Sequence, residues 1–295
     1  MKKGLILVNA FYNPPSYYNQ STRLKEEFEK KGISIDILKN DFFPAYIDKC
    51  GSITSFTSQY DFCIFLDKDK YLSLMLEKSG LRLFNKHDAI RICDDKMDTF
   101  IYLSGNNIKM PKTLSGLLCY DKNAVISENT ILKIENELNY PIIVKESYGS
   151  LGKNVYLANN RTELSSLMQD LKLKPHLFQE CIKTSIAKDV RIIVIGKEKI
   201  FAMKRQSNID FRSNVELGGV ASKIDLPNSF KDLAIKVANL IDLDYCGIDL
   251  LIGENNEPIL CEVNSNAFFG GIEKVTGENI AKCYVEYIIK EVYKN

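Results

Sequence analysis

The sequence predicts an α/β protein with more than one lobe. Three observations support this class: the first part of the chain alternates strand, helix and strand, the second half is rich in paired strands, and the length exceeds that of one ordinary domain. The chain has 295 residues, whereas a domain usually takes about 100–200. The strand, helix and strand order is typical of a small unit with a parallel sheet.

The elements of the first part follow from their apolar patterns. Continuous apolar runs over residues 5–10 and 62–66 predict buried strands, because a strand covered on both faces lacks polar alternation. Residues 33–38 alternate between apolar and polar, as a half-buried strand does. Residues 21–31 are rich in charge and stop before Gly32, which predicts a surface helix.

Helices and strands are mixed from residue 87 onward. We expect helices over 87–103, 131–138, 163–171, 228–240 and from about 278, and strands over 141–145, 155–157, 190–195, 199–204, 247–252 and 258–263. Asn228 is expected to cap its helix, and glycine-containing turns at 196–197 and 253–256 to close two hairpins. We place a first boundary near residue 90 and a second near residue 180.

The charge balance argues against nucleic-acid binding. Lys and Arg total 39 against 38 Asp and Glu, a net charge of +1, whereas phosphate contacts require a clear basic excess. No apolar run approaches the roughly 18 residues that span a bilayer, and the apolar start is too short for a signal peptide. We therefore expect neither a nucleic-acid nor a membrane partner.

The cysteines indicate a reducing compartment. Eight are present, none in C-x-x-C spacing, and several lie in apolar runs, which is typical of buried free thiols in a cytoplasmic protein. His87 and His176 lie far apart, so a zinc site built from Cys and His is not expected.

Two familiar nucleotide signatures are absent from the sequence. It contains no Gly-x-x-x-x-Gly-Lys-[Ser/Thr] phosphate loop, and no Gly-x-Gly-x-x-Gly follows the first strand. A nucleotide site of the P-loop or Rossmann type is therefore disfavoured.

Three oxygen-bearing side chains gather on the last predicted hairpin. Glu262 and Asn264 are two residues apart and share a strand face, and the short turn can place Asp249 beside them. Two carboxylates and an amide oxygen are hard donors suited to Mg²⁺, and adjacent carboxylates repel unless a cation neutralises them or a proton bridges them. Each residue alone would fit a solvated strand face equally well, but the three together favour a metal site.

Cations with phosphate-binding potential precede this hairpin. Lys145 ends a buried strand and opens a Ser/Gly segment, 147–153, whose backbone N–H groups can hold an anion; the alternative is a lysine that reaches out to solvent. Lys96 alone is an ordinary helix charge. The remaining candidates lie in two short segments: Asp189 with Arg191, and Arg205 followed by Asp210-Phe211-Arg212-Ser213-Asn214.

The order of these pieces resembles the ATP-grasp superfamily, and most closely the RimK-type glutamate ligases, including relatives that act on lysine-biosynthesis carrier proteins. The resemblance runs from about residue 85 to the C-terminus, and the first ~85 residues match only in general character. It rests on Asp210–Asn214 with Gly218-Gly219, on Glu262-Val263-Asn264, and on Gly271-Ile272-Glu273-Lys274 with Thr276-Gly277.

The resemblance implies an ATP-grasp fold with a small α/β pre-ATP-grasp domain at 1–90, a small lobe at 91–180 and a large lobe at 181–295. It also implies roles for single residues. Lys96, Lys145, Ser150, Glu180, Cys181, Asp189, Arg212, Ser213 and Asn214 would bind the nucleotide, with Glu180 and Cys181 at the hinge; Asp249, Glu262 and Asn264 would bind two metal ions; and Arg191, Arg205 and Arg212 would serve catalysis.

The function implied is an ATP-dependent carboxylate-amine ligase that forms an amide through an acyl phosphate and releases ADP and phosphate. Its cofactors would be ATP and two Mg²⁺ ions, with Mn²⁺ as a substitute. Its partners would be a carboxylate and an amine such as glutamate, carried by a metabolite, a peptide or a protein tail, and the resemblance also allows a homo-oligomer. Two alternatives stay open: a ligase that tailors a dipeptide or peptide, and a nucleotide-binding regulatory module without turnover.

The sequence departs from the family pattern at two places. Asn154 stands where many relatives have a further glycine, and Asn tolerates left-handed backbone geometry. Ala267 and Phe268 stand where RimK-type enzymes have Pro-Gly. The second departure is near the expected substrate side and argues against simple transfer of the ribosomal-protein substrate.

Overall fold

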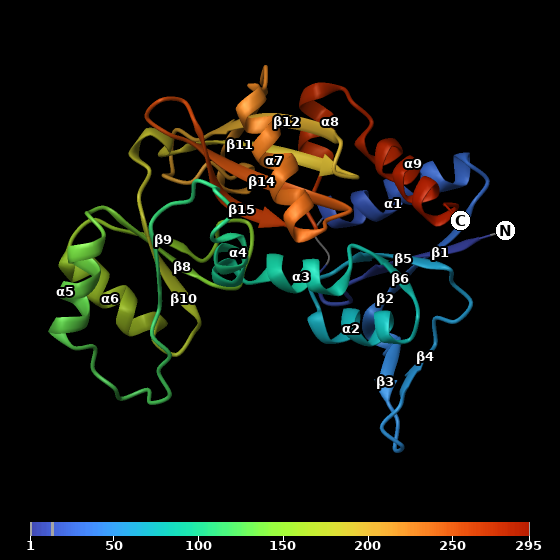
Figure 1. Cartoon of the computed structure of the whole chain (residues 1–295), viewed down its shortest axis with the longest axis horizontal. Helices are drawn as coiled ribbons and strands as arrows, with labels where there is room; N and C mark the ends of the chain where they lie inside the picture. Colours follow the sequence, from blue (N-terminus) through green and yellow to red (C-terminus); the bar gives the residue numbers. More distant parts are fainter. Residues whose placement is uncertain (1, 13–14, 295) are drawn as a thin grey trace.

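The computed structural model describes residues 2–12 and 15–294. Its first unit is a parallel sheet in the order β2-β1-β5-β6, which confirms the expected parallel arrangement. Its strands are β1 (Lys3–Val8), β2 (Ser34–Lys39), β5 (Phe62–Leu66) and β6 (Arg82–Phe84), and its helices are α1 (Pro15–Lys30) and α2 (Lys70–Lys78). A small hairpin of β3 (Ala45–Ile47) and β4 (Ile53–Ser55) projects from this unit (Figure 1).

The continuous apolar runs in these strands are explained by burial of both faces of the sheet. Ile6 and Ile64 belong to the core cluster that includes Phe28 of α1, whereas Leu5 and Phe65 belong to the cluster on the opposite face of the sheet. Successive side chains in a strand point to opposite faces, so both faces require apolar residues when both are buried.

The expected helix over 87–103 is wrong, because the chain forms two helices. α3 (His87–Asp94) and α4 (Lys96–Leu103) are separated by Asp95, whose backbone is extended at φ −101° and ψ 113°. The Asp95 side chain accepts hydrogen bonds from the N–H groups of Met97 and Asp98. An Asp competes for backbone N–H groups and favours a helix start over a helix interior, so Lys96 becomes the first residue of α4.

A four-stranded antiparallel sheet forms the middle of the chain, in the order β7-β10-β8-β9. Its strands are β7 (Thr113–Ser115), β8 (Ile142–Glu146), β9 (Val155–Ala158) and β10 (His176–Glu180), and its helices are α5 (Glu128–Glu137) and α6 (Arg161–Leu171). Both helices lie on one face of the sheet (Figure 1) and bury Ile131, Leu164 and Phe178 against it. These two helices do not cover the opposite face of the sheet.

A five-stranded sheet in the order β13-β12-β11-β14-β15 forms the last part. Its strands are β11 (Lys188–Ile195), β12 (Lys199–Gln206), β13 (Val220–Lys223), β14 (Tyr245–Ile252) and β15 (Pro258–Asn264). Its helices are α7 (Asn228–Ile241), α8 (Gly270–Thr276) and α9 (Ile280–Val292). Short 3₁₀ helices also occur, η1 (Asn40–Phe42) in the first unit and η2 (Lys183–Ser185) and η3 (Val215–Leu217) in the last part. Both expected hairpins are confirmed by their antiparallel registers. The expected cap by Asn228 is wrong, because Pro227 takes that position and no side chain caps the helix.

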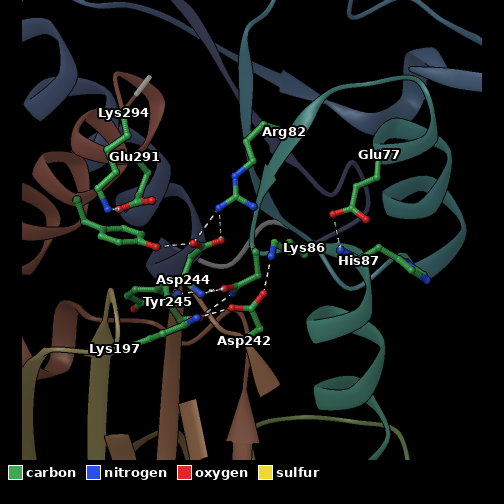
Figure 2. Close-up of polar contacts among 12 residues, drawn as sticks. Glu77, Arg82, Lys86, His87, Lys197, Asp242, Asp244, Tyr245, Glu291 and Lys294 are labelled. Atoms are coloured by element: carbon green, nitrogen blue, oxygen red, sulfur yellow. Dashed lines mark hydrogen bonds and ion pairs between the residues drawn. The ribbon is translucent and has the colours of Figure 1, made fainter. Parts of the chain in front are cut away.

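The parallel sheet is joined to the last sheet by a polar contact (Figure 2). Arg82 donates to both Asp244 carboxylate oxygens, at 3.0 and 3.1 Å, and the Tyr287 hydroxyl donates to the same carboxylate at 2.5 Å. Burial raises the pKa of the Asp244 carboxyl, against the lowering effect of Arg82. Lys86 and Lys197 both pair with Asp242 beside it.

Asn85 is the centre of this contact. Its amide nitrogen donates to the carbonyl oxygens of Tyr245 and Ser265, at 2.7 and 2.9 Å. Its amide oxygen accepts from the N–H groups of Asp244 and Tyr245, at 2.7 and 3.0 Å. All four hydrogen-bonding positions of a buried amide are therefore used. Asn85 thus fixes the end of β15 relative to the parallel sheet.

Glu27 ties α1 to the start of α9, and its charge should stabilise the fold at neutral pH. Its carboxylate accepts from Lys30 at 2.8 Å and from the amide of Asn279 at 3.0 Å, and these hydrogen bonds hold the pKa of Glu27 below its ordinary value. We expect Glu27→Gln to lower the free energy of unfolding at pH 7 by about 1–2 kcal/mol, since bonds to a charged group are stronger than neutral ones.

The pH dependence of Glu27→Gln follows from a lowered folded pKa. The stabilisation is fully present above the unfolded pKa of about 4.3 and is lost as the pH falls through the lower folded value. Urea unfolding of both proteins between pH 3 and pH 7 measures it, with the exposed Glu29→Gln on the same helix as the control. A stability difference that stays constant with pH would contradict the assignment.

Across residues 2–12 and 15–294, no helix combines the length and the apolar character that crossing a bilayer requires.

Candidate functional site

A cavity of about 120 Å³ lies between the middle sheet and the five-stranded sheet, and we call it the first cavity. Segments far apart in sequence line it, including the start of α4, β8, β10, the loop after β12, and the β14–β15 hairpin. Eleven of the residues singled out from the sequence line it: Lys96, Lys145, Glu180, Cys181, Asp189, Arg205, Arg212, Ser213, Asn214, Asp249 and Glu262.

A second cavity, of about 240 Å³, adjoins the first. Glu262 and Asn214 line both. The remaining candidates, Ser150, Arg191 and Asn264, line the second cavity only. The structure therefore brings all the sequence candidates to two neighbouring cavities that share a carboxylate.

The proposed metal ligands lie on adjacent strands. Asp249 on β14 is the register partner of Glu262 on β15, and a bulge follows Asp249. Asn264 is two residues further along β15, so it shares the face of Glu262. This is the arrangement that the hairpin predicted, because a short turn sets the register of its two strands.

The donor set fits Mg²⁺. In the described parts of the chain, no three His, Cys, Asp or Glu side chains come together as a metal cluster, so the candidate consists of two carboxylates and one amide oxygen. Mg²⁺ usually takes one or two protein carboxylates, together with water and substrate phosphates. Asn264 Oδ1 also accepts from the N–H of Asn266 at 3.0 Å, which orients the amide.

Asp249 lies in a buried network of four charges. Arg191 donates to its two oxygens, both at 2.7 Å, and Arg205 lies 2.9 Å from one of them. Arg205 also pairs with Asp189, through a 2.8 Å bond and a second, shorter one. Burial alone would raise the pKa of the Asp249 carboxyl, but the two guanidinium groups hold it well below its usual range.

The network directs Arg205 toward protein groups. Its side chain is only 2% exposed, and its guanidinium forms ion pairs with two carboxylates. Its expected contact with an acyl phosphate, and that of Asp189 with the nucleotide, stay predictions. Arg191 lines the second cavity, whereas Arg205 lines the first.

Lys96 and Lys145 are both buried in the first cavity. The alternative in which Lys145 reaches out to solvent is therefore wrong. Lys96 donates to the Gly149 carbonyl at 2.8 Å and lies 3.9 Å from a Glu262 oxygen, and burial lowers its pKa. Lys145 lies 3.9 Å from the Cys261 sulfur. Two buried ammonium groups with so little compensation favour an anionic ligand.

The Ser/Gly loop is held by the segment after β12. Gly152 has φ +70°, and a Cβ there would lie 2.7 Å from Asn214 Oδ1, so a glycine is required. Arg212 donates to the Gly152 carbonyl at 2.5 Å and is itself held by Asp210. The left-handed non-glycine residue of the loop is Leu151, at φ 62°, rather than Asn154.

The end of β10 and the residues after it, which were expected to form the hinge, line one side of the first cavity. The Glu180 carboxylate accepts from the N–H of Lys112 at 2.9 Å, and the Glu180 N–H donates to the Lys112 carbonyl at 3.0 Å. Cys181 follows at the rim, where burial raises the pKa of its thiol. The Glu180 side chain is thus engaged by the backbone that leads into β7.

Sequence reasoning missed the apolar wall of the first cavity. Ile143 and Leu251 line it, together with Val155, Ile182 and Ile186. The two-residue period of a strand could have found two of them, because Ile143 shares a face with Lys145, and Leu251 shares one with Asp249. An apolar wall beside buried cations suits a ligand with a planar base and a phosphate tail.

Sequence reasoning also missed the contribution of the parallel sheet to the second cavity. Asn9 directly follows β1, and Asp67 and Lys68 directly follow β5. Polar residues just beyond the carboxyl ends of adjacent parallel strands were the available signal, because ligands bind there in open α/β sheets.

Comparison with known proteins identifies the family of this chain. Residues 93–288 match the family described as the RimK-like ATP-grasp domain. N-acetylaspartylglutamate synthase A of Homo sapiens is 35% identical over 223 residues, which are 75% of this chain and 56% of that protein. A probable alpha-L-glutamate ligase of Psychromonas ingrahamii is 32% identical over 285 residues, 92% of this chain and 91% of that one. This chain thus spans just over half the length of the synthase that it matches.

Solved structures share the whole fold. The D-alanine–D-alanine ligase of Bacillus anthracis, solved with ATP, has a TM-score of 0.74 at 13% identity, over 99% of this chain and 97% of that one. The likeness confirms the expected ATP-grasp fold.

Proposed function

Because this chain belongs to the RimK-like ATP-grasp family, we propose that it is an ATP-dependent ligase that joins a carboxylate to an amine. One observation carries the proposal. Two buried lysines, Lys96 and Lys145, line one cavity together with the Asp249–Glu262 pair, and Glu262 also lines a second cavity. A nucleotide in the first cavity would meet a second substrate in the other at a single carboxylate.

The chemistry requires this arrangement. A carboxylate attacks the γ-phosphoryl group of ATP, which forms an acyl phosphate and releases ADP. An amine then attacks the acyl carbon, the C–N bond forms, phosphate leaves with its electron pair, and the amine protons not kept in the amide pass to solvent. Both steps concentrate negative charge, and preorganised cations stabilise such charge most effectively.

The chain's residues have distinct parts in this scheme. Lys96 and Lys145 hold the phosphates, Ser213 and Asn214 orient them, and the loop of Ser150 covers them. Glu180 and Cys181 hold the base against the apolar wall. Asp249, Glu262 and Asn264 would hold two Mg²⁺ ions, for which Mn²⁺ can substitute, and these ions would neutralise the phosphate charge.

Three arginines complete the scheme. Arg191 faces the acyl phosphate from the second cavity, Arg205 positions Asp249 through the buried network, and Arg212 positions the loop through Gly152. Asp189 orients Arg205. The boundaries near residues 90 and 180 stay predictions.

Glutamate is the amine that we propose, because a relative matched over most of both chains is described as a probable alpha-L-glutamate ligase, and a second, matched over just over half of its length, as a synthase of a glutamate-containing product. The carboxylate partner is a small acid or the end of a peptide. The reducing cytoplasm suits the eight free thiols, Cys63, Cys93 and Cys246 being buried.

A coupled assay of ADP and phosphate release tests the proposal. We expect release to rise well above the background only when Mg-ATP, L-glutamate and a carboxylate such as N-acetyl-L-aspartate or a peptide ending in glutamate are all present. Intact-mass analysis of the peptide separates peptide modification from metabolite synthesis. Nucleotide binding in a thermal-shift assay, without release on any combination, would overturn ligase function in favour of a regulatory module.

A further inference from the structure

The second cavity lies at the topological switch point of the parallel sheet. β1 has β2 on one side and β5 on the other, so the chain leaves the sheet in opposite directions at the carboxyl ends of β1 and β5. Such a crevice is the preferred ligand site of an open α/β sheet. Asn9 and Lys68, at these two strand ends, line the cavity together with Glu262 and Asn266.

Asn266 leaves a buried hydrogen-bond acceptor unused. Its side-chain oxygen Oδ1 is one of the few buried side-chain atoms without a hydrogen-bond partner in residues 2–12 and 15–294. Buried polar atoms are nearly always paired, and an exception calls for an explanation such as a missing ligand. The side-chain oxygen of the neighbouring Asn264 cannot pair with it, because an amide oxygen only accepts, and this one already accepts from the Asn266 N–H at 3.0 Å. A ligand that meets Asn266 Oδ1 must carry a donor.

Lys68 supplies the cation of the cavity. Its ammonium group is 3.4 Å from Asp94 and its side chain is 29% exposed, so it is loosely paired. Asp67 is already engaged, because its carboxylate accepts from the amides of Asn9 and Asn40 and from the N–H of Lys68. Arg191 is bound to Asp249. Lys68 is therefore the group that can turn toward an anion.

These features distinguish the two substrates of a ligase. An acyl donor without an N–H group offers only acceptors, so it would leave the Asn266 oxygen unpaired. The amide N–H of a donor such as N-acetyl-L-aspartate would lack the positive charge that the Glu262 carboxylate in the same cavity favours. An amino acid offers both an ammonium donor and a carboxylate. We propose that Asn266 and Lys68 form the subsite of the amine substrate, an amino acid such as L-glutamate, with its ammonium on Asn266 Oδ1 and a carboxylate on Lys68. This inference rests on the proposed function and names the residues that would select its amine.

A pair of matched ligands tests the subsite without turnover. L-glutamate and 2-oxoglutarate carry the same two carboxylates and differ in the ammonium group. We measure their affinities by calorimetry for the full chain loaded with Mg²⁺ and a non-hydrolysable ATP analogue. We expect the wild-type protein to prefer L-glutamate by about tenfold or more, since a hydrogen bond to a charged donor is at stake.

The variants separate the two contacts. Asn266→Leu should remove the preference by weakening L-glutamate binding about tenfold while leaving 2-oxoglutarate unchanged. Lys68→Met should weaken both ligands alike. Asn255→Leu, on the exposed turn of the same hairpin, is the control and should change neither.

Three results would overturn the inference: a preference for L-glutamate that survives Asn266→Leu, equal loss of both ligands and of the ATP analogue in that variant, or no binding of L-glutamate to the wild-type protein. The third differs from a failure of the proposed function. If L-glutamate binds with the expected preference but no combination of substrates releases phosphate, the subsite stands and the ligase proposal fails.

Discussion

Glu262→Gln is expected to reduce the ligase rate by about 10²–10³-fold, the usual loss when one preorganised charge is removed from a reaction centre. Glu262 lines both cavities, faces Asp249 in register on the adjacent strand, and lies 3.9 Å from Lys96. Glutamine keeps the shape but lacks the charge and one of the two acceptor oxygens, so it should hold Mg²⁺ poorly. Turnover is measured as ADP release at saturating L-glutamate and N-acetyl-L-aspartate.

Two further measurements locate the effect of Glu262→Gln. The affinity for ADP should fall in the presence of Mg²⁺ and change little with EDTA, because the defect concerns the metal. Glu257→Gln is the matched control: Glu257 is on the same hairpin, pairs with Lys109 at 3.3 Å and lies outside both cavities, so its rate should be unchanged. Full turnover by Glu262→Gln would remove the metal assignment and with it the reaction scheme.

Arg205→Met is expected to destabilise the fold by about 3–5 kcal/mol, the usual cost of removing one partner from a buried ion pair. The network of Arg191, Arg205, Asp189 and Asp249 is neutral as a whole. Deleting Arg205 leaves one carboxylate in excess inside the protein, where an unpaired charge is poorly solvated. Methionine fills a similar volume, so the loss measures charge more than packing.

A double variant separates charge balance from local packing. Asp189→Asn added to Arg205→Met leaves the Arg191–Asp249 pair neutral, and we expect it to recover part of the lost stability, as residues of one network are energetically coupled. Urea unfolding followed by circular dichroism compares the variants. Arg161→Met is the control, because Arg161 pairs with Glu135 at an exposed site and such pairs contribute little. A single variant as stable as the wild type would show that the network is not required for folding.

The elements that sequence reasoning found share one property, which is a local pattern strong enough to decide the structure. The expected strand over 62–66 coincides with β5 because every residue of it is buried. The Asp249–Glu262 pairing followed from a short hairpin, whose turn sets the register. The order of the motifs indicated the family for the same reason, since each motif consists of a few neighbouring residues.

The errors arose where side chains compete for the backbone or where partners are distant. Asp95 breaks the helix over 87–103 because its carboxylate caps the next one, and the surrounding periodicity conceals this. α8 has only seven residues and follows a loop without a clear stop signal. The structural role of Asn85 could not be predicted from the sequence, since its four hydrogen-bond partners lie about 160 to 180 residues away.

The sequence alone determined the ATP-grasp family, the hairpin that carries Asp249, Glu262 and Asn264, and the cations that precede it, because the hydrophobic period and the short motifs depend on neighbouring residues. Only the tertiary structure decided that Arg205 lies between two carboxylates, that Lys145 is turned inward, and that the end of β5 meets the end of β15 around a second cavity. Burial and charge compensation depend on which distant segments come into contact, and these contacts exist only once the sheets have packed together.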